Sequence, residues 1–374
     1  MRALKNLNDL LEAIEGELRN LKESDTVCLI HHDDGDGCSS AALFSIIVTR
    51  LTGIAPIFFP IRGPNNITYK LVNQIKTISP DYLFTLDVSL EPIKLSIFRG
   101  FVLDHHLTDF HDAGGMMYIN PRSFEKEDDK VVPTSYMIYK VLKAMYPDEK
   151  ASWVAGIGIT EDHRVELCRD VFEDIKADYP DLFEGEISQI NMEKSVFGRA
   201  WDIVRAGRMV RKTDGAKTAV EALVETKNRP DKFLNGLTQH SFALMRFYSK
   251  VAFETQYSLS EVRERGKFYR DKKVIIFETK PSRINALTSF IADKIRQEYP
   301  DYIICVVGSE YGLEKRKISV RLEQSKRKEN LVDILEKVKK EVPSVKGGGH
   351  QSAIGIFVDY NDLDDFLKEF VAAI

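Results

Sequence analysis

Short apolar runs, rich in β-branched and aromatic residues, alternate with longer amphipathic stretches in the first third of the chain. Helical spacing of apolar residues appears between several runs, as in "SSAALFSIIVTRL", and it predicts a further helix over 133–146. Strands that alternate with helices are typical of a parallel sheet with helices on both faces. We therefore predict an α/β domain whose strands lie at 26–30, 55–59, 82–86, 100–103 and 116–119.

A second, smaller α/β pattern occupies the C-terminal part of the chain. From about 165 to 265 the sequence is polar and helical in pattern, which indicates helices that complete the first domain. Strand-like runs "KKVIIFETK", "DYIICVVGSE" and "KISVRLE" follow, and then a helix, the glycine turn "KGGGHQSAIG", a strand and a final helix. We expect a first domain at 1–250, a connector at 251–270 and a smaller α/β domain at 271–374.

Composition narrows the class of protein. With 374 residues, 43% hydrophobic and 29% charged, the chain is an ordinary globular protein with room for two domains. No apolar run approaches the roughly eighteen residues of a membrane span, and the N-terminus lacks a secretory pattern. The four cysteines are far apart without a CxxC pair, which favours a reducing cytoplasm. A net charge of −4 argues against bulk electrostatic binding of nucleic acid, but it allows local basic surfaces.

Acidic and imidazole side chains gather where three of the predicted strands end. The segment "LIHHDDGDGCSSAALF" places His32, Asp34 and Asp36 at alternating positions directly after the first strand. Alternate side chains of an extended segment point the same way, so these three face one point. The third strand ends on Asp87, and the fourth is followed by "DHH". In an open parallel sheet these positions meet at the carboxyl edge, where ligands bind.

Such clusters indicate a metal site. Neighbouring carboxylates repel one another, and a divalent cation removes that penalty. Carboxylate and imidazole ligands without thiolates suit Mn(II), or Mg(II) or Co(II), better than structural zinc. A single Asp after a strand is usually a turn residue or a helix cap, but three clusters at one edge are better explained by metal. His31 points opposite to His32 in an extended chain, so we favour His32 as the ligand.

A serine hydrolase is the other chemistry that this region suggests. Ser39 and Ser40 directly follow the first cluster. The GxSxG nucleophile elbow is missing from the sequence, however, and the two serines are better explained as the opening of the next helix.

These clusters resemble the first three motifs of the DHH phosphoesterase superfamily. Within that superfamily the form "HHDDGDGCSSAA" is most similar to RecJ-like proteins of archaeal type. "WVAGIGITED" is similar to the fourth motif, a glycine-flanked helical segment that ends in an aspartate, and it supplies Gly158 and Asp162. Glu161 stands where the family often has glycine, which makes it a rival ligand to Asp162.

The resemblance implies two divalent cations, preferably Mn(II), with Mg(II) or Co(II) as alternatives. The ligands of the first cation would be His32, Asp34 and Asp87, and those of the second Asp36, Asp87, His105 and Asp162. Asp104 would orient an imidazole, and His106 would approach the phosphate or the leaving oxygen. The resemblance also implies that the catalytic cleft lies between the two lobes.

The C-terminal half resembles the DHH-associated substrate-binding domain with its GGGH signature. The glycines admit close approach of a phosphate and expose backbone N–H groups, although a glycine turn can also simply connect two elements. Basic stretches at 205–215 and 314–328 could follow a single strand, or they could be solvated surface balanced by glutamates. Expected substrate contacts are Arg321, Gly347, Gly348, Gly349, His350 and Arg283.

The predicted function is a Mn(II)-dependent phosphodiesterase, in the manner of a RecJ-like exonuclease on single-stranded DNA or RNA. Hydrolysis of short oligonucleotides, cyclic dinucleotides or phosphoadenosine nucleotides is the alternative, because the length is close to the two-domain minimum. A third hypothesis is a non-catalytic replication scaffold. This hypothesis is disfavoured because every expected metal-ligand position is filled. Replication or repair proteins, such as a helicase, are expected partners, and no membrane is expected.

Overall fold

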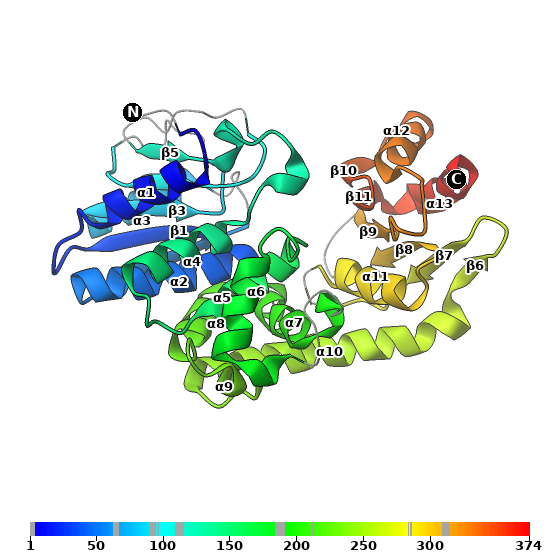
Figure 1. The fold of residues 1–374 in the computed structure, drawn as a ribbon. Helices are drawn as coiled ribbons and strands as arrows, with labels where there is room; N and C mark the ends of the chain where they lie inside the picture. Colours follow the sequence, from blue (N-terminus) through cyan, green and yellow to red (C-terminus); the bar gives the residue numbers. More distant parts are fainter. Residues whose placement is uncertain are drawn as a thin grey trace. The chain divides into compact units, whose positions relative to one another are not determined.

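A computed structural model shows two compact units (Figure 1). The first unit comprises Met1–Arg208 and Thr213–Tyr248, and the second Met209–Lys212 and Ser249–Ile374. No helix in the described part of the chain is long and apolar enough to span a membrane. The structure describes residues 4–62, 67–89, 95, 97–108, 116–183, 191–210, 213–282, 284, 286–308 and 315–374.

A five-stranded parallel sheet forms the centre of the first unit, as the alternating pattern predicts. Its order is β2-β1-β3-β4-β5, so the chain runs outward from β1 in both directions. In the register of neighbouring strands, His31 lies beside Leu86, and Leu86 lies beside Leu103. The residues that follow these strands therefore share one edge of the sheet. The strands are β1 (Val27–His32), β2 (Ile57–Ile61), β3 (Tyr82–Leu86), β4 (Phe101–Leu103) and β5 (Met117–Ile119).

Helices cover both faces of this sheet, which confirms the predicted architecture. One hydrophobic core joins the sheet to helices α1 (Leu7–Leu18), α2 (Gly35–Thr52), α4 (Thr134–Met145) and α5 (Ser152–Glu161). A second core joins the opposite face to α3 (Tyr69–Ile78), through side chains such as Val72 and Ile75. Burial of these apolar side chains on two faces explains why the strands are short, nearly continuous apolar runs in the sequence.

Helix α2 is largely enclosed, with every residue from Gly35 to Val48 buried. It packs against β1, α4, α5 and α8 (Gly215–Glu225). Its N-terminus begins at the carboxyl edge of the sheet, where Asp34 is the N-cap and accepts a hydrogen bond from the backbone N–H of Gly37 (3.0 Å). This packing fixes the position of the first acidic cluster relative to the sheet.

The rest of the first unit is helical, as the polar periodic sequence predicts. The last of its helices, α10, continues from the first unit into the second. The elements are α6 (Arg169–Asp178), α7 (Val196–Met209), α8 (Gly215–Glu225), α9 (Pro230–Leu234) and α10 (Gln239–Arg265).

The second unit contains a six-stranded mixed sheet in the order β10-β11-β9-β8-β7-β6. Only β7 and β8 pair in parallel, and the other neighbours are antiparallel. Apolar side chains of α12 and α13 join the core of this sheet. The elements are β6 (Lys267–Tyr269), β7 (Val274–Glu278), α11 (Leu287–Glu298), β8 (Ile303–Gly308), β9 (Lys315–Arg321), α12 (Leu331–Glu341), β10 (Lys346–His350), β11 (Ala353–Asp359) and α13 (Leu363–Ala373).

The glycine segment predicted to be a turn is instead the exposed edge strand β10. Gly347 and Gly349 have φ values of +156° and +150°, which L side chains rarely adopt. A Cβ on Gly349 would lie 2.2 Å from the carbonyl oxygen of Ala353 on the paired strand. The glycines therefore allow an unusually close hairpin, and the reversal itself falls at residues 351–352.

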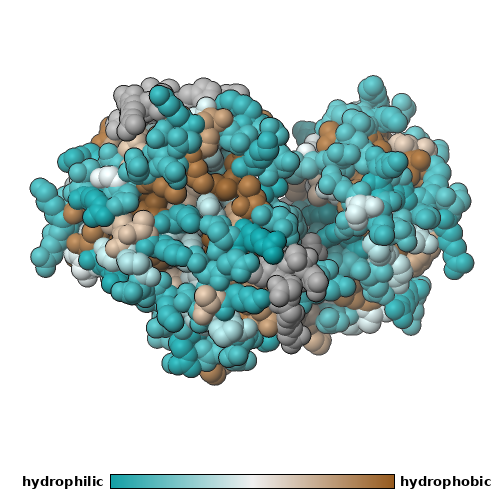
Figure 2. All heavy atoms as spheres, in the orientation of Figure 1, coloured by the Kyte–Doolittle hydropathy of each residue, from teal (hydrophilic) through white to brown (hydrophobic). Residues whose placement is uncertain are grey.

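The visible surface of each unit is mainly hydrophilic, and the cysteine thiols are buried. Hydrophilic residues cover most of the face that Figure 2 shows on each unit. Cys28, Cys38, Cys168 and Cys305 are separate free thiols, and all four are buried. Burial raises the pKa of Cys28 to about 11 and that of Cys305 to about 12, and it raises the pKa of the other two thiols as well.

Candidate metal centre

The predicted clusters converge at the carboxyl edge of the first sheet. Asp87 directly follows β3, is only 2% exposed and has a φ of 62°, an uncommon value for any residue except glycine. Its backbone N–H donates to the carbonyl oxygen of Leu103 (2.8 Å), which holds this conformation. Backbone strain that is enforced in this way is characteristic of functional sites.

Three groups of side chains in the described chain could each hold a metal ion. Within each group the ligand atoms lie within 4.8 Å of one another. Asp87 belongs to two groups, and so does His105, so the groups form one continuous centre. The groups are His32 with Asp34 and Asp87, Asp36 with His105 and Asp162, and Asp87 with His105 and His106.

The distances place His105 at the centre of the second group. Its Nε2 lies 3.2 Å from Asp87 Oδ1, 3.4 Å from Asp162 Oδ2 and 3.9 Å from Asp36 Oδ2. On the other side of the centre, His32 Nδ1 lies 3.6 Å from Asp87 Oδ2 and in close contact with Asp34 Oδ2.

Several of these buried atoms lie close together without forming hydrogen bonds. His32 Nδ1, Asp87 Oδ2 and Asp162 Oδ2 all lack a hydrogen-bond partner of good geometry. Buried polar atoms are normally hydrogen-bonded, so converging lone pairs of this kind need another explanation. Oxygen and nitrogen donors that face shared points fit divalent cations, and the donor set therefore fits the predicted two-cation site.

The electrostatics of the protein alone show how strongly this site favours positive charge. Burial opposes protonation of the histidines, but the charges of the neighbouring aspartates outweigh it and raise the pKa of His32 to about 11 and that of His105 to about 10. Burial, reinforced by the charge of Asp87, raises the pKa of Asp36 to about 7, and burial also raises that of Asp162.

The side chain of Asp36 is held by the N-terminus of α4. The backbone N–H groups of Thr134 and Ser135 donate to its two carboxylate oxygens, at 2.9 and 3.0 Å. A carboxylate at a helix N-terminus is stabilised by the orphan N–H groups and by the helix dipole. Gly158 of α5 packs on the other side, where a Cβ would lie 2.6 Å from Asp36 Oδ1. Both helices thus fix the position of one predicted ligand.

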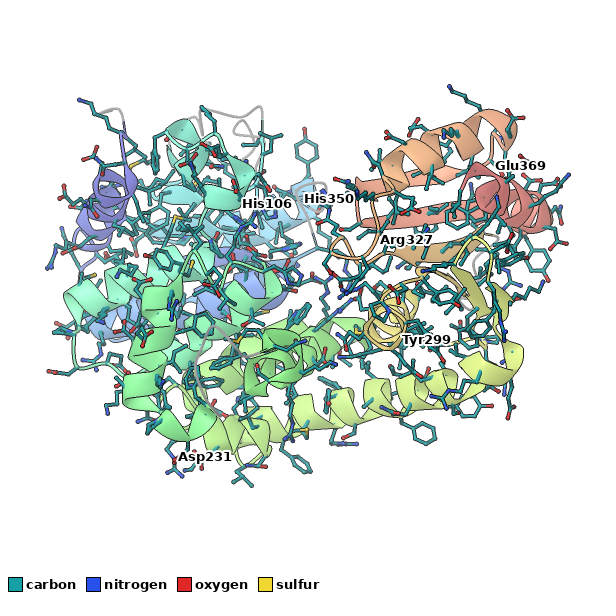
Figure 3. All side chains as sticks on the ribbon, turned by 45° about the vertical axis from the view of Figure 1, so that its right-hand side comes forward. His106, Asp231, Tyr299, Arg327, His350 and Glu369 are labelled. Atoms are coloured by element: carbon teal, nitrogen blue, oxygen red, sulfur yellow. The ribbon has the colours of Figure 1, made fainter. Side chains whose placement is uncertain are left out.

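Asp104 and His106 form a hydrogen-bonded pair beside the metal groups. Asp104 is fully buried and accepts hydrogen bonds from Ser89 Oγ and, at 2.8 Å, from His106 Nδ1. The side chain of His106, labelled in Figure 3, is 50% exposed. Burial opposes its charge, but the hydrogen bond with Asp104 and the charge of Asp87 outweigh it and raise the pKa of His106.

His31 and Glu161, the two rivals to the predicted ligands, make other contacts. His31 belongs to none of the metal groups among the described residues, and its Nδ1 contacts the carbonyl oxygen of His32 (2.7 Å). Glu161 uses both carboxylate oxygens as acceptors, from the backbone N–H of Asp36 and from Nε1–H of Trp201, each at 2.8 Å. No local sequence pattern points to Trp201, because its contact depends on long-range packing.

Arginines on neighbouring elements contact the two segments that carry the predicted metal ligands. Arg208 of α7 and Arg62 each lie 3.2 Å from a carboxylate oxygen of Asp33, which stands between two predicted ligands. Arg122 donates from Nε to the carbonyl oxygen of His105 (2.8 Å). Of these cations, only Arg208 lies in a stretch that the sequence analysis singled out.

The predicted substrate contacts lie in the second unit. Arg321, at the end of β9, donates to Asp293 Oδ1 (2.7 Å) and to the carbonyl oxygen of Val320 (2.9 Å). His350 ends the exposed strand β10 and is labelled in Figure 3. The three glycines belong to the same strand. Arg283 lies outside the described residues.

Comparisons with known proteins agree with this architecture. Residues 271–374 match the DHHA1 domain family. No curated protein matches the sequence significantly.

Solved structures share the fold. Manganese-bound RecJ from Thermus thermophilus aligns with a TM-score of 0.67 and 16% identity over 99% of this chain, which spans only 54% of that protein. An exonuclease RecJ bound to manganese aligns with a TM-score of 0.62 and 16% identity, over 99% of this chain and 94% of that one. The pGpG-specific phosphodiesterase PggH from Vibrio cholerae aligns with a TM-score of 0.51 and 13% identity, over 93% of this chain and 98% of that one.

The two-domain α/β architecture, the acidic centre at the sheet edge and the DHHA1 match define the class of protein. Residues 271–374 form a DHHA1 domain, and the chain as a whole has a RecJ-like fold.

Proposed function

We propose that the protein is a two-metal phosphodiesterase, and most specifically a Mn(II)-dependent exonuclease that degrades single-stranded DNA or RNA. The observation that carries this proposal is the sharing of Asp87 and His105 between the metal groups. Shared ligands would hold two cations in one continuous site, and paired cations in phosphoryl-transfer enzymes stabilise both the attacking and the leaving oxygen. The manganese-bound RecJ structures support the choice of fold and of metal.

The residues that would hold the cations are those predicted from the sequence. His32, Asp34 and Asp87 would hold the first, and the second would take Asp87 together with Asp36, His105 and Asp162. When bound, the cations supply Lewis acidity, which lowers the pKa of a water and neutralises charge on phosphoryl oxygens.

His106 is the residue that would handle a proton. The hydrogen bond with Asp104 and the charge of Asp87 raise its pKa, and its exposed side allows approach of a phosphate or a leaving oxygen. Asp104 fixes the ring through Nδ1 (2.8 Å), which leaves the other ring nitrogen to exchange a proton with the substrate. Ser89 in turn orients Asp104.

The DHHA1 domain would hold the substrate strand. We propose that Arg321, Gly347, Gly348, Gly349 and His350 contact its phosphates, with Arg283 as a further contact. The three glycines of the exposed edge strand β10 have no side chains, which would let a phosphate approach the backbone closely.

The test is digestion of 5′-labelled single-stranded DNA and RNA with Mn(II), resolved to single nucleotides. Asp87→Asn is the matched control, because asparagine also tolerates a positive φ and keeps the side-chain volume. Cleavage by the wild type that is lost in the variant is the expected result. Equal cleavage by both proteins would refute the proposal.

Hydrolysis of short oligonucleotides or dinucleotides is the second candidate. Ion pairs between the basic stretch at 314–328 and nearby carboxylates favour this candidate. A cation that is already paired with a carboxylate is poorly suited to binding the phosphates of a long strand. Four cations of the stretch contact carboxylates: Lys315 with Asp359, Arg316 with Glu278, Arg321 with Asp293 and Arg327 with Glu329. Release of mononucleotides from pGpG, without cleavage of long oligomers, would favour this candidate.

We further propose a cytoplasmic location and association with replication or repair proteins such as a helicase. Four buried free thiols are compatible with a reducing compartment.

A further inference from the structure

Glu161 connects the two acidic segments that would share the second cation. It is the last residue of α5 and directly precedes Asp162. Its Oε2 accepts a hydrogen bond from the backbone N–H of Asp36 (2.8 Å), in the first turn of α2. A residue next to one proposed ligand therefore holds the backbone of another that is 125 positions away in sequence.

A tight local fit gives Glu161 a fixed orientation. Its other oxygen, Oε1, accepts from Nε1–H of Trp201 on α7 (2.8 Å). A Cβ on Gly35 would lie 2.4 Å from Glu161 Oε2 and 3.1 Å from Trp201 Cδ1. Glycine at this position thus permits the close approach, and a larger residue would push the carboxylate away from α2.

Two carboxylates accept hydrogen bonds from the backbone N–H groups in the first turn of α2. Asp34 accepts from the N–H of Gly37, and Glu161 accepts from that of Asp36. Asp34 is itself a proposed ligand, whereas Glu161 belongs to no metal group in the described part of the chain. Both carboxylate oxygens of Glu161 already accept hydrogen bonds from N–H groups. Glu161 therefore acts on the site by holding the backbone of Asp36.

We propose that Glu161 is a positioning residue that holds Asp36 at the distance from Asp162 that the second cation requires. The inference rests on the proposed function and extends it to a residue outside the ligand set. The carboxylate of Asp36 is fixed by α4, and its backbone is fixed by Glu161, so the ligand cannot rotate away from the centre.

The chemistry of Glu161→Gln gives a sharp test. An amide has only one acceptor oxygen, but two N–H donors face this side chain. In the variant one donor must therefore face the NH2 group, and the hydrogen bond to Asp36 competes with that to Trp201. Adding Trp201→Phe removes the competing donor, so the amide oxygen can turn to Asp36.

The measurement is calorimetric titration of the metal-free protein with Mn(II). Asp34→Asn and Asp36→Asn assign the two binding steps to the two sites. We expect Glu161→Gln to weaken the second site by about 10- to 100-fold and to leave the first unchanged. Glu161→Gln with Trp201→Phe should recover part of that affinity.

Asn6→Ala is the matched control for loss of a helix cap, because Asn6 caps α1 through the N–H of Asp9 (2.9 Å) and the metal groups do not include it. It should bind Mn(II) like the wild type. Wild-type affinity in Glu161→Gln, equal weakening of both sites, or further weakening in the double variant would each overturn the inference. Failure of the proposed function is distinct, because it would appear as a wild type that cleaves no phosphodiester.

Discussion

Gly158 offers the sharpest single test of the centre. A Cβ at this position would lie 2.4 Å from Ser135 Oγ, 2.6 Å from Asp36 Oδ1 and 2.9 Å from Asp36 Cα. Because ordinary contact begins near 3.4 Å, Gly158→Ala must displace the carboxylate of Asp36 by about 0.8 Å, which exceeds the tolerance of about 0.5 Å for functional sites. Overpacking costs about 1–3 kcal/mol, and the better helix propensity of alanine offsets about 1 kcal/mol.

The expected result is therefore a folded protein with a damaged cation site. Titration with Mn(II) should show at least a roughly tenfold loss of affinity at the second site, with activity lost in parallel. Gly156→Ala is the control on the same helix, because its Cβ would meet the mobile end of Ile175 (Cδ1 at 2.8 Å) and the ring of Phe197. Wild-type affinity in Gly158→Ala, or an equal loss in Gly156→Ala, would show that this packing does not set the site.

Three further predictions concern the hydrogen-bonded pair of Asp104 and His106, the pH dependence of stability, and the glycines of β10. Asp104→Asn should lower kcat by about 10²- to 10⁴-fold and leave Mn(II) affinity unchanged, because Asp104 orients the ring of His106 and belongs to none of the metal groups in the described chain; calorimetry and kinetics together check this. The pKa of Asp36 is raised from 3.8 to about 7, so the metal-free fold loses stability as pH rises through this window, and the rise in melting temperature on adding Mn(II) should grow from about pH 5 to pH 8. A stabilisation independent of pH would contradict this reasoning. Gly349→Ala should lower the melting temperature, whereas Gly348→Ala, with no atom within 4 Å of its Cβ, should keep the melting temperature and raise KM for the nucleic-acid substrate; an unchanged KM would argue against a phosphate at this strand.

Much of the fold could be predicted because its signals are local. Three apolar runs end with the strands β3, β4 and β5, whereas β1 and β2 continue two residues beyond the predicted ends, so His32 is the last residue of β1. Acidic residues directly follow β1, β3 and β4. Parallel strands bring such positions to one edge, so His32, Asp87 and His105 could be expected together before any coordinates were known. Alternation along an extended segment also separates His32 from its neighbour His31.

Other features depend on contacts between distant residues and had no local signal. The N-terminus of α4 binds the carboxylate of Asp36 across 98 positions, and Trp201 reaches Glu161 across 40. Only packed helices bring these residues together. The edge strand β10 was predicted as a turn, because glycines usually mark turns, whereas here they permit a close hairpin.

The four buried thiols make the protein a convenient frame for site-specific chemistry. A thiol with a raised pKa and no exposed surface reacts slowly with maleimides and with alkylating reagents. One cysteine introduced on the exposed side of each unit would therefore be the preferred target of a fluorescent label. Energy transfer between two such dyes would report whether the separation between the sheet that carries the acidic centre and the DHHA1 domain changes when single-stranded nucleic acid is added, without prior removal of any native cysteine.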